Sequence, residues 1–204
     1  MTFVRSLPPS SCTATLHTTH HALRTFDAFE CRRIIDVGCG DCFFEEAYPG
    51  RFVGIDVEPR RLADGAGRGV HGILVGKAEE LPFPDEAFDG VLAKDVLEHL
   101  YLEQAFRFLA EARRVLRRGG IFVIVTFQAT QSFWDKPDHV RPYSNKWVRR
   151  VLVQELGGFE VVEERRFSAG IPGFGRLGIA WLAHCLAQWL RIRYDHGMIV
   201  VRKQ

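Results

Sequence analysis

The stretch RIIDVGCGDCFFEEAYPGRFVGID, residues 33–56, constrains the fold of this chain more than any other segment. An apolar, β-branched run is followed by a glycine-containing turn, a helix-compatible run and a second apolar run, over residues 34–37, 38–40, 43–47 and 52–55. The second apolar run ends on an acid, Asp56. This order predicts a βαβ unit with a carboxylate at the end of its second strand.

The glycine turn and the downstream acid together predict a nucleoside site. Glycine lets the backbone approach a ligand closely, and an acid about 20 residues further on is placed to accept the hydroxyls of a ribose. Gly38 and Asp56 have this spacing. A dinucleotide fingerprint would place glycine or alanine three residues after Gly40, where this chain has Phe43. Asp36 would repel a pyrophosphate but could engage a cation, so the pattern favours a positively charged nucleoside.

The rest of the chain continues an alternation of helices and strands. Apolar spacing and end signals predict helices over residues 22–29, 58–66, 100–117 and 146–156. Short apolar runs predict strands over residues 72–75, 87–93, 121–126, 159–167 and 198–202. Gly119 and Gly120 are expected to end the third of these helices. Such an alternation is typical of an α/β fold with a mostly parallel sheet.

Four ordered blocks carry a resemblance to a known family: DVGCGDC, GID, GKAEELPFPDEAFDGVLAKDVLEHL and EARRVLRRGGIFVIVTF. They cover residues 34–127, and this part of the chain resembles the class I S-adenosylmethionine-dependent methyltransferases of the broad small-molecule, type 11-like group. The resemblance implies a Rossmann-like three-layer sandwich with a seven-stranded sheet in the order 3-2-1-4-5-7-6, its last strand antiparallel. It also implies one domain over residues 1–204, with a cap segment over 1–30 and an insertion between the last two strands over 168–196.

The same resemblance implies S-adenosylmethionine as the methyl donor and S-adenosylhomocysteine as the product. The residues expected to bind the donor are Asp36, Gly38, Cys39, Gly40, Asp56, Val57, Lys77, Ala78, Glu79, Lys94, Asp95 and Val96. Lys77 departs from the family, which usually has an aspartate there to accept a hydrogen bond from the adenine amino group, and a charged lysine cannot accept one. The Ala78 N–H and the Glu79 carboxylate are the alternative adenine contacts, and Lys77 would then point to solvent. Cys42 replaces the usual third glycine and is expected to point toward the methionine part of the donor.

The polar stretch QATQSFWDKPDHVRPY, residues 128–143, is the predicted acceptor loop. Its D-H-V-R-P-Y-S part resembles the H-x-R-x-[YF]-[ST] stretch that follows the fifth strand in many enzymes of this group, with Ser144 capping the next helix. Alignment of donor and acceptor supplies most of the catalysis, and a base is needed only for a protonated acceptor. The catalytic residues expected are His139 as the base, together with Arg141 and Tyr143. The alternative is that His139 and Arg141 only hold the loop in place.

Two other clusters of ligand-type residues are interpreted without a metal. His17, His20 and His21 lie in a polar terminal stretch with no further recognisable ligand. Cys39 and Cys42 form a C-x-x-C motif, but neither a second pair nor a thioredoxin-like context accompanies it. No metal site is therefore expected.

A nearly apolar run over residues 178–192 is too short to span a bilayer. Because the family builds part of the acceptor site from this region, the run is expected to be a pocket lid or, with residues from 174 onward, the face of a homodimer. Contact with a membrane surface is the third alternative. The acceptor is expected to be a small molecule, and a hydrophobic one would suit such a lid.

Charge and cysteine usage exclude some other classes. A net charge of +2 and the lack of a basic run with interleaved aromatics argue against a nucleic-acid partner. Five irregularly placed cysteines suit a reducing compartment, and the first 19 residues lack a signal-peptide core, so a cytoplasmic location is expected.

Three functions follow from these patterns. The first is an enzyme that methylates an oxygen, nitrogen or carbon nucleophile. The second is a cofactor-binding protein or partner subunit without transfer activity. The third is a nicotinamide-dependent oxidoreductase or epimerase, against which Phe43 argues.

Overall fold

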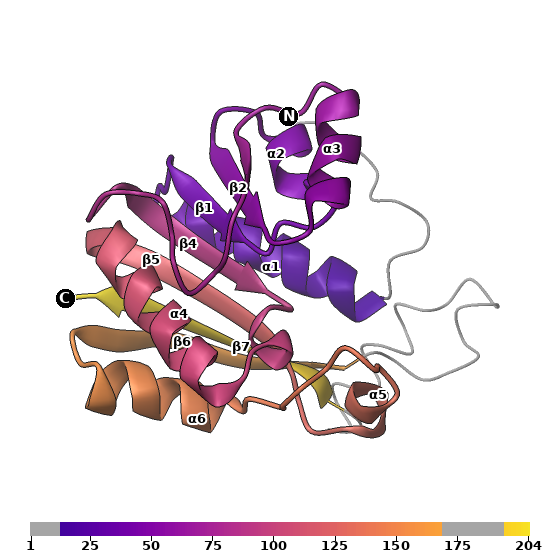
Figure 1. The fold of residues 1–204 in the computed structure, drawn as a ribbon. Helices are drawn as coiled ribbons and strands as arrows, with labels where there is room; N and C mark the ends of the chain where they lie inside the picture. Colours follow the sequence, from indigo (N-terminus) through magenta and orange to yellow (C-terminus); the bar gives the residue numbers. More distant parts are fainter. Residues whose placement is uncertain (1–12, 169–193) are drawn as a thin grey trace.

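The computed structural model describes residues 13–168 and 194–204, which form a twisted sheet with helices on both faces (Figure 1). The strands are β1 (Ile34–Val37), β2 (Phe52–Asp56), β3 (Ile73–Val75), β4 (Phe88–Lys94), β5 (Leu116–Phe127), β6 (Phe159–Ser168) and β7 (Tyr194–Lys203). Their order in the sheet is β3-β2-β1-β4-β5-β7-β6. The first five strands pair in parallel and β7 is antiparallel to both of its neighbours, which confirms the predicted topology.

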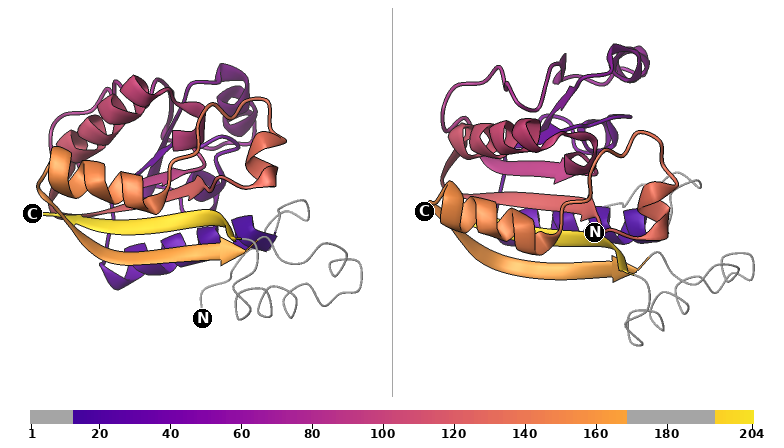
Figure 2. Two further views of the ribbon diagram at one scale, coloured as in Figure 1. Left: turned by 90° about the horizontal axis from the view of Figure 1, so that it is seen from below. Right: turned by 60° about the horizontal axis from the view of Figure 1, so that its bottom comes forward.

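Two apolar layers hold the helices against the sheet. The helices are α1 (Thr13–Ala28), α2 (Phe43–Ala47), α3 (Pro59–Gly67), α4 (Leu102–Val115), α5 (Gln131–Trp134) and α6 (Asn145–Arg149), with single turns η1 (Leu97–His99) and η2 (Arg150–Glu155). Figure 2 shows α1 on one face of the sheet and α4 and α6 on the other. Ala22 and Phe26 of α1 pack on Ile34 and Phe52 in one layer, and α4 packs on the other layer.

Helix α1 begins well before the predicted start at residue 22. Its extra turns present Thr18 and Thr19 to the protein interior, and these side chains are at most 5% exposed. A buried threonine is stable when its hydroxyl is hydrogen-bonded, as that of Thr25 is to the His21 carbonyl oxygen at 3.0 Å. The apolar spacing alone therefore detects only the second half of the helix.

The connection from α4 to β5 differs from the prediction that Gly119 and Gly120 end a helix over 100–117. The helix ends at Val115, and β5 begins at the next residue, Leu116. Both side chains are fully buried, so the chain passes from helix to strand inside the core. The strand pairing then skips from Leu116 to Ile121, which leaves residues 117–120 as an irregularity at the edge of the pairing.

The last strand is longer than predicted and takes residues 194–196 from the expected insertion over 168–196. Residue 168 ends β6, and residues 169–193 of that insertion, including the lid or dimer helix expected over 174–192, lie outside the described residues. In the described ranges, no helix combines the length and the apolar character needed to cross a membrane.

The sheet topology fixes where a ligand site can form. Strand β1 lies between β2 and β4: the chain runs from β1 to β2 and β3 on one side of β1, and then crosses over to β4 on the other side. The carboxyl ends of these three strands meet at one rim, and this reversal of strand order is where open α/β sheets bind ligands.

Candidate functional site

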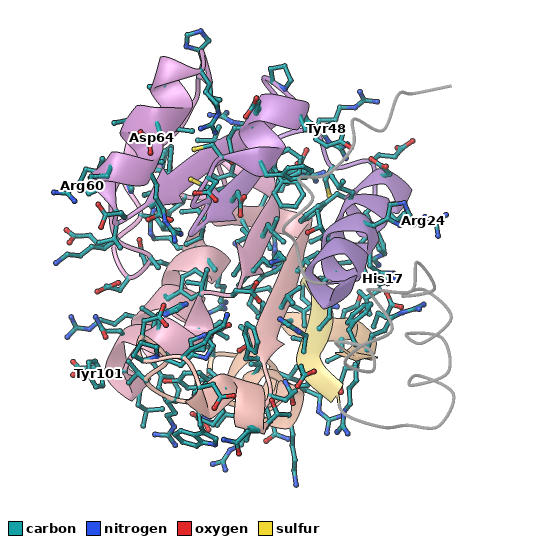
Figure 3. The ribbon with its side chains drawn as sticks, turned by 90° about the vertical axis from the view of Figure 1, so that its right-hand side faces the viewer. His17, Arg24, Tyr48, Arg60, Asp64 and Tyr101 are labelled. Carbon is teal, nitrogen blue, oxygen red and sulfur yellow. The ribbon has the colours of Figure 1, made fainter. Side chains whose placement is uncertain are left out.

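A cavity of about 660 Å³ opens at the rim formed by β1, β2 and β4. This volume lies within the roughly 300–1,000 Å³ that is typical of small-molecule sites. Eight of the twelve residues predicted to bind the donor line it: Gly38, Asp56, Val57, Lys77, Ala78, Glu79, Asp95 and Val96. Figure 3 shows Arg60 on α3 and Tyr101 ahead of α4 on the same side of the molecule. Their neighbours in the chain, Arg61 and Leu100, line the cavity.

The other four predicted donor-binding residues lie around the cavity and do not line it. Gly40 is in the turn itself, and Cys39 and Asp36 are buried beneath it. Burial raises the pKa of the Asp36 carboxyl well above its usual range; the charge of Glu45 adds to this, and that of Lys94 opposes it. The Lys94 ammonium donates to the Asp95 carboxylate at 2.5 Å.

The turn after β1 has a conformation that requires glycine. Gly38 has a φ of +74°, and a Cβ atom added there would lie 2.5 Å from Val96 Cγ2, closer than real contacts allow. The backbone N–H groups of Gly38 and Cys39 both donate to the Ile55 carbonyl oxygen, at 2.7 and 3.2 Å. The turn is therefore held against β2, with its backbone at the cavity wall.

Asp56 joins this turn to the one after β2. Its Oδ2 accepts a hydrogen bond from the Gly40 N–H and its Oδ1 accepts one from the Glu58 N–H, both at 2.8 Å. Each carboxylate oxygen has two lone pairs, so each can still accept a ligand hydroxyl. Because Asp56 also lines the cavity, its geometry suits a vicinal diol.

The segment after β3 forms the opposite wall. Lys77 is exposed, and its carbonyl oxygen accepts from the Glu80 N–H at 3.3 Å. The Glu79 carboxylate accepts from Gln104 Nε2 at 3.1 Å, which fixes its position next to the cavity. Both interpretations of this segment therefore stay compatible with the geometry: Lys77 has access to solvent, and Glu79 and Ala78 lie at the wall.

Cys42 lies differently from its prediction. It has a φ of +60°, the backbone conformation of a glycine, but its side chain is fully buried and packs with Leu62 and Val70. It therefore points into the protein, away from the cavity. The expectation that its side chain faces the methionine part of the donor is wrong.

The predicted acceptor loop brings its histidine beside a second one. The His139 ring lies 5.0 Å from the ring of His99, which lines the cavity, and within 4.9 Å of the rings of Phe127 and Phe133. Burial lowers the pKa of His139, and the nearby His99 and Lys136 lower it further. These effects favour the neutral form of the His139 imidazole, and His99 rather than His139 lines the cavity.

The other two predicted catalytic residues do not reach the cavity. Tyr143 is 1% exposed, and its hydroxyl donates to the Leu100 carbonyl oxygen at 2.9 Å, so it is a packed core residue. Arg141 is exposed, and its backbone N–H donates to the Glu98 carbonyl oxygen at 3.3 Å. The structure therefore argues against a catalytic role for Tyr143 and gives Arg141 a part in holding the loop.

Sequence reasoning misses His196. This residue is 2% exposed, and its Nε2 lies 3.6 Å from Oδ1 of Asp95, a residue held in a strained left-handed conformation with a φ of +58°. The sequence analysis places His196 in the insertion because the last apolar run begins only at Met198. The polar pair Asp195-His196 directly before that run is the sequence feature that could have pointed to it.

The buried carboxyl group of Glu98 should make the stability of the protein depend measurably on pH. Its carboxylate accepts from the Thr126 hydroxyl at 3.1 Å, and burial together with the charge of Asp95 raises its pKa from 4.5 to about 8. Between about pH 4.5 and about pH 8, the folded protein thus keeps a proton on Glu98 that the unfolded chain releases, and stability falls as the pH rises through this range. A Glu98→Gln variant stays neutral and does not lose stability in this way. The difference in free energy of unfolding, variant minus wild type, should therefore increase by about 2 kcal/mol or more between about pH 5 and about pH 9.

Chemical denaturation at several pH values measures this difference. The matched control is Glu103→Gln, which removes an exposed acid from α4 and leaves the interior unchanged. Parallel stability curves for Glu98→Gln and the wild type would contradict the prediction.

Comparison with known proteins gives consistent matches. A family model described as a methyltransferase domain matches residues 35–124. A protein of Mycolicibacterium smegmatis named "Probable S-adenosylmethionine-dependent methyltransferase" is 32% identical over 139 residues, 64% of this chain and 52% of that protein. A fatty-acid O-methyltransferase of the same organism is 31% identical over 155 residues, 70% of this chain and 53% of that protein. The chain thus spans about half the length of these curated relatives.

A solved structure extends the likeness to the whole fold. The crystal structure of an S-adenosylmethionine-dependent methyltransferase from Archaeoglobus fulgidus has a TM-score of 0.72 and 21% identity, and covers 94% of this chain and 95% of its own. At this identity the likeness concerns the fold.

Proposed function

Because the chain is a member of the class I S-adenosylmethionine-dependent methyltransferases, we propose that it transfers a methyl group from that cofactor to an oxygen, nitrogen or carbon nucleophile of a small molecule. The observation that carries this proposal is the cavity at the β1, β2 and β4 rim. It combines a close-approach glycine turn, a carboxylate suited to a diol and an acid-rich wall. When bound, the cofactor supplies a methyl group already activated on a sulfonium.

The residues present fit this cofactor. Asp56 would accept the ribose hydroxyls, and the backbone at Gly38 would lie against the amino-acid part. Asp95 lines the cavity and has a buried Oδ1 without a hydrogen-bond partner among the described residues, which suits a cationic ligand. Val57 and Ala78 would contact the adenosine, with Glu79 near the adenine in place of the aspartate usual in the family.

We place the acceptor beside His99 and Asp138, which line the cavity at the side of the predicted acceptor loop. If the acceptor is protonated, His99 would take its proton, and the Asp138 carboxylate, 3.5 Å from His99 Nδ1, would stabilise the imidazolium that forms. Arg141 would keep the loop in position through its backbone. The main contribution of the chain would be to hold the nucleophile in line with the methyl group, which can lower the barrier by about 7–11 kcal/mol.

The names of the curated relatives favour a lipophilic acceptor. One is a fatty-acid O-methyltransferase and another a ubiquinone biosynthesis O-methyltransferase, and both names specify transfer to oxygen. We therefore propose a hydrophobic acceptor with a hydroxyl or carboxyl group as the most informative first choice.

Transfer of a radiolabelled methyl group from S-adenosylmethionine to a panel of fatty acids, phenols, quinols and amines tests the proposal. We expect labelled product with at least one oxygen acceptor, and a rate about tenfold or more lower in a His99→Ala variant when that acceptor is protonated. Calorimetric binding of S-adenosylhomocysteine, measured in parallel, checks that the donor site is intact. Binding without transfer to any acceptor would favour a cofactor-binding partner subunit, and absence of binding would refute the proposal.

A further inference from the structure

A second set of ligand-type side chains lies beneath the glycine turn, separate from the residues that line the cavity. Cys39 Sγ, Cys42 Sγ and a carboxylate oxygen of Glu45 lie within 4.8 Å of one another. The three residues follow each other at intervals of three, and the Cys42 N–H donates to the Cys39 carbonyl oxygen at 2.9 Å. This single turn places both sulfurs and the carboxylate on the same side of the chain.

The buried carboxylate of Glu45 is the second observation that points to a ligand here. Its side chain is 1% exposed, and neither carboxylate oxygen has a hydrogen-bond partner among the described residues. A buried polar group without a partner costs about 1–3 kcal/mol, and more when it is charged. Such a group indicates an interaction that the protein atoms alone do not supply, and a bound ion is one of the few that fit.

The surroundings are tight and bring the ligand atoms together. A Cβ atom added to Gly54 would lie 2.7 Å from Cys39 Sγ and 2.8 Å from Glu45 Oε1, so only glycine in β2 leaves room for both groups. Gly65 of α3 makes the same kind of space for Cys42 Sγ, which would lie 2.9 Å from a Cβ atom added to that glycine. Asp36, the strand partner of Gly54, is 4% exposed and is a candidate for a fourth ligand.

We propose that Cys39, Cys42 and Glu45 bind a Zn²⁺ ion beneath the cofactor turn. Two thiolates and a carboxylate are ligands that zinc accepts in a tetrahedral site, and C-x-x-C spacing is usual for its cysteines. On binding, each thiol releases its proton to solvent, and Cys42 gives up its weak hydrogen bond to the Gly40 carbonyl oxygen at 3.6 Å. The ion would stabilise the turn from below without contact with the methyl acceptor.

Metal analysis of the full-length protein, prepared under reducing conditions, tests this inference. We expect about one zinc per chain after dialysis, and Co²⁺ added to the metal-free protein should produce thiolate-to-cobalt charge-transfer absorption. Cys42→Ser should weaken metal binding about tenfold or more and reduce that absorption. Glu45→Gln should weaken binding to a similar degree but keep the absorption, because both thiolates remain.

Cys31→Ser is the matched control, because Cys31 is also buried but lies in the apolar layer under α1, with its thiol 3.4 Å from the Asp89 carbonyl oxygen. Its metal content and spectrum should equal those of the wild type. If Cys42→Ser fails to fold, protection of wild-type thiols from alkylation by Zn²⁺ gives the same information. Absence of stoichiometric metal, an unchanged spectrum in Cys42→Ser, or a Cys39–Cys42 disulfide in the reduced preparation would overturn the proposal, whatever the result with S-adenosylhomocysteine.

Discussion

An Asp56→Ala variant is expected to bind S-adenosylmethionine and S-adenosylhomocysteine about 100-fold or more weakly than the wild type. Without the carboxylate, the site loses two charge-assisted hydrogen bonds to the ribose, each worth about 1.5 kcal/mol or more. The Gly40 and Glu58 N–H groups, which donate to the carboxylate at 2.8 Å, also lose their acceptor. Isothermal titration calorimetry with S-adenosylhomocysteine measures the loss directly.

Asp64→Ala is the matched control, because Asp64 is an exposed acid on the neighbouring helix α3 (Figure 3). Its affinity should stay within about twofold of the wild type. An Asp56→Asn variant, which keeps an acceptor oxygen for one backbone N–H, should fall between the two. Circular dichroism of each variant separates loss of the ligand contact from loss of fold. Unchanged affinity in folded Asp56→Ala would refute the assignment of the ribose to this residue.

A Gly38→Ala variant is expected to lose both stability and affinity. The new methyl group would lie 2.5 Å from Val96 Cγ2, in a backbone conformation with a φ of +74° that favours glycine. The conformational strain costs about 1–2 kcal/mol and the overpacking about 1–3 kcal/mol, so the free energy of unfolding should fall by about 2–5 kcal/mol. Because the turn must shift to relieve the contact, binding of S-adenosylhomocysteine should weaken about tenfold or more.

A Gly50→Ala variant separates the conformational strain from the overpacking. Gly50 has a similar φ of +81°, but a Cβ atom added there meets nothing within 4 Å, so only the conformational strain remains. Adding Val96→Ala to Gly38→Ala should restore part of the stability by removing the contact partner. Equal destabilisation by Gly38→Ala and Gly50→Ala in chemical denaturation would contradict the steric explanation.

The sequence predicts the central strands β1, β2 and β4 better than the helices, because these strands are buried on both faces and are nearly continuous apolar runs. All four residues of the strand Ile34–Val37 are buried, for example. Shifting this strand along its neighbours would bring polar residues from outside the run into the interior. The apolar spacing underestimates helix α1 because the buried face of this helix includes threonines, whose hydroxyls can be satisfied by the preceding turn of the same helix. The predicted end of α4 is misplaced because the glycines that follow it form an irregularity of β5 instead of a helix cap.

The candidate site likewise contains residues that the sequence predicts correctly and residues that it does not. Residues fixed by the backbone of the βαβ unit, such as Gly38 and Asp56, line the cavity as expected. Tyr143 and His196 cannot be placed from local pattern, because one is turned into the core and the other is brought to the rim by an antiparallel strand from the far end of the chain. The sequence shows the C-x-x-C pair of Cys39 and Cys42 but not the third member of their cluster, Glu45, since burial of a helix acid depends on how α2 lies on β2.

The direct passage from α4 to β5 also limits how the gene for this chain can vary. Val115 and Leu116 are both fully buried, so extra residues between them would push apolar side chains out of the interior. A few residues further on, the exposed stretch over 117–119 offers a place where insertions, tags or new chain ends would be tolerated. Length variation in this part of the protein should therefore be confined to a segment of a few residues.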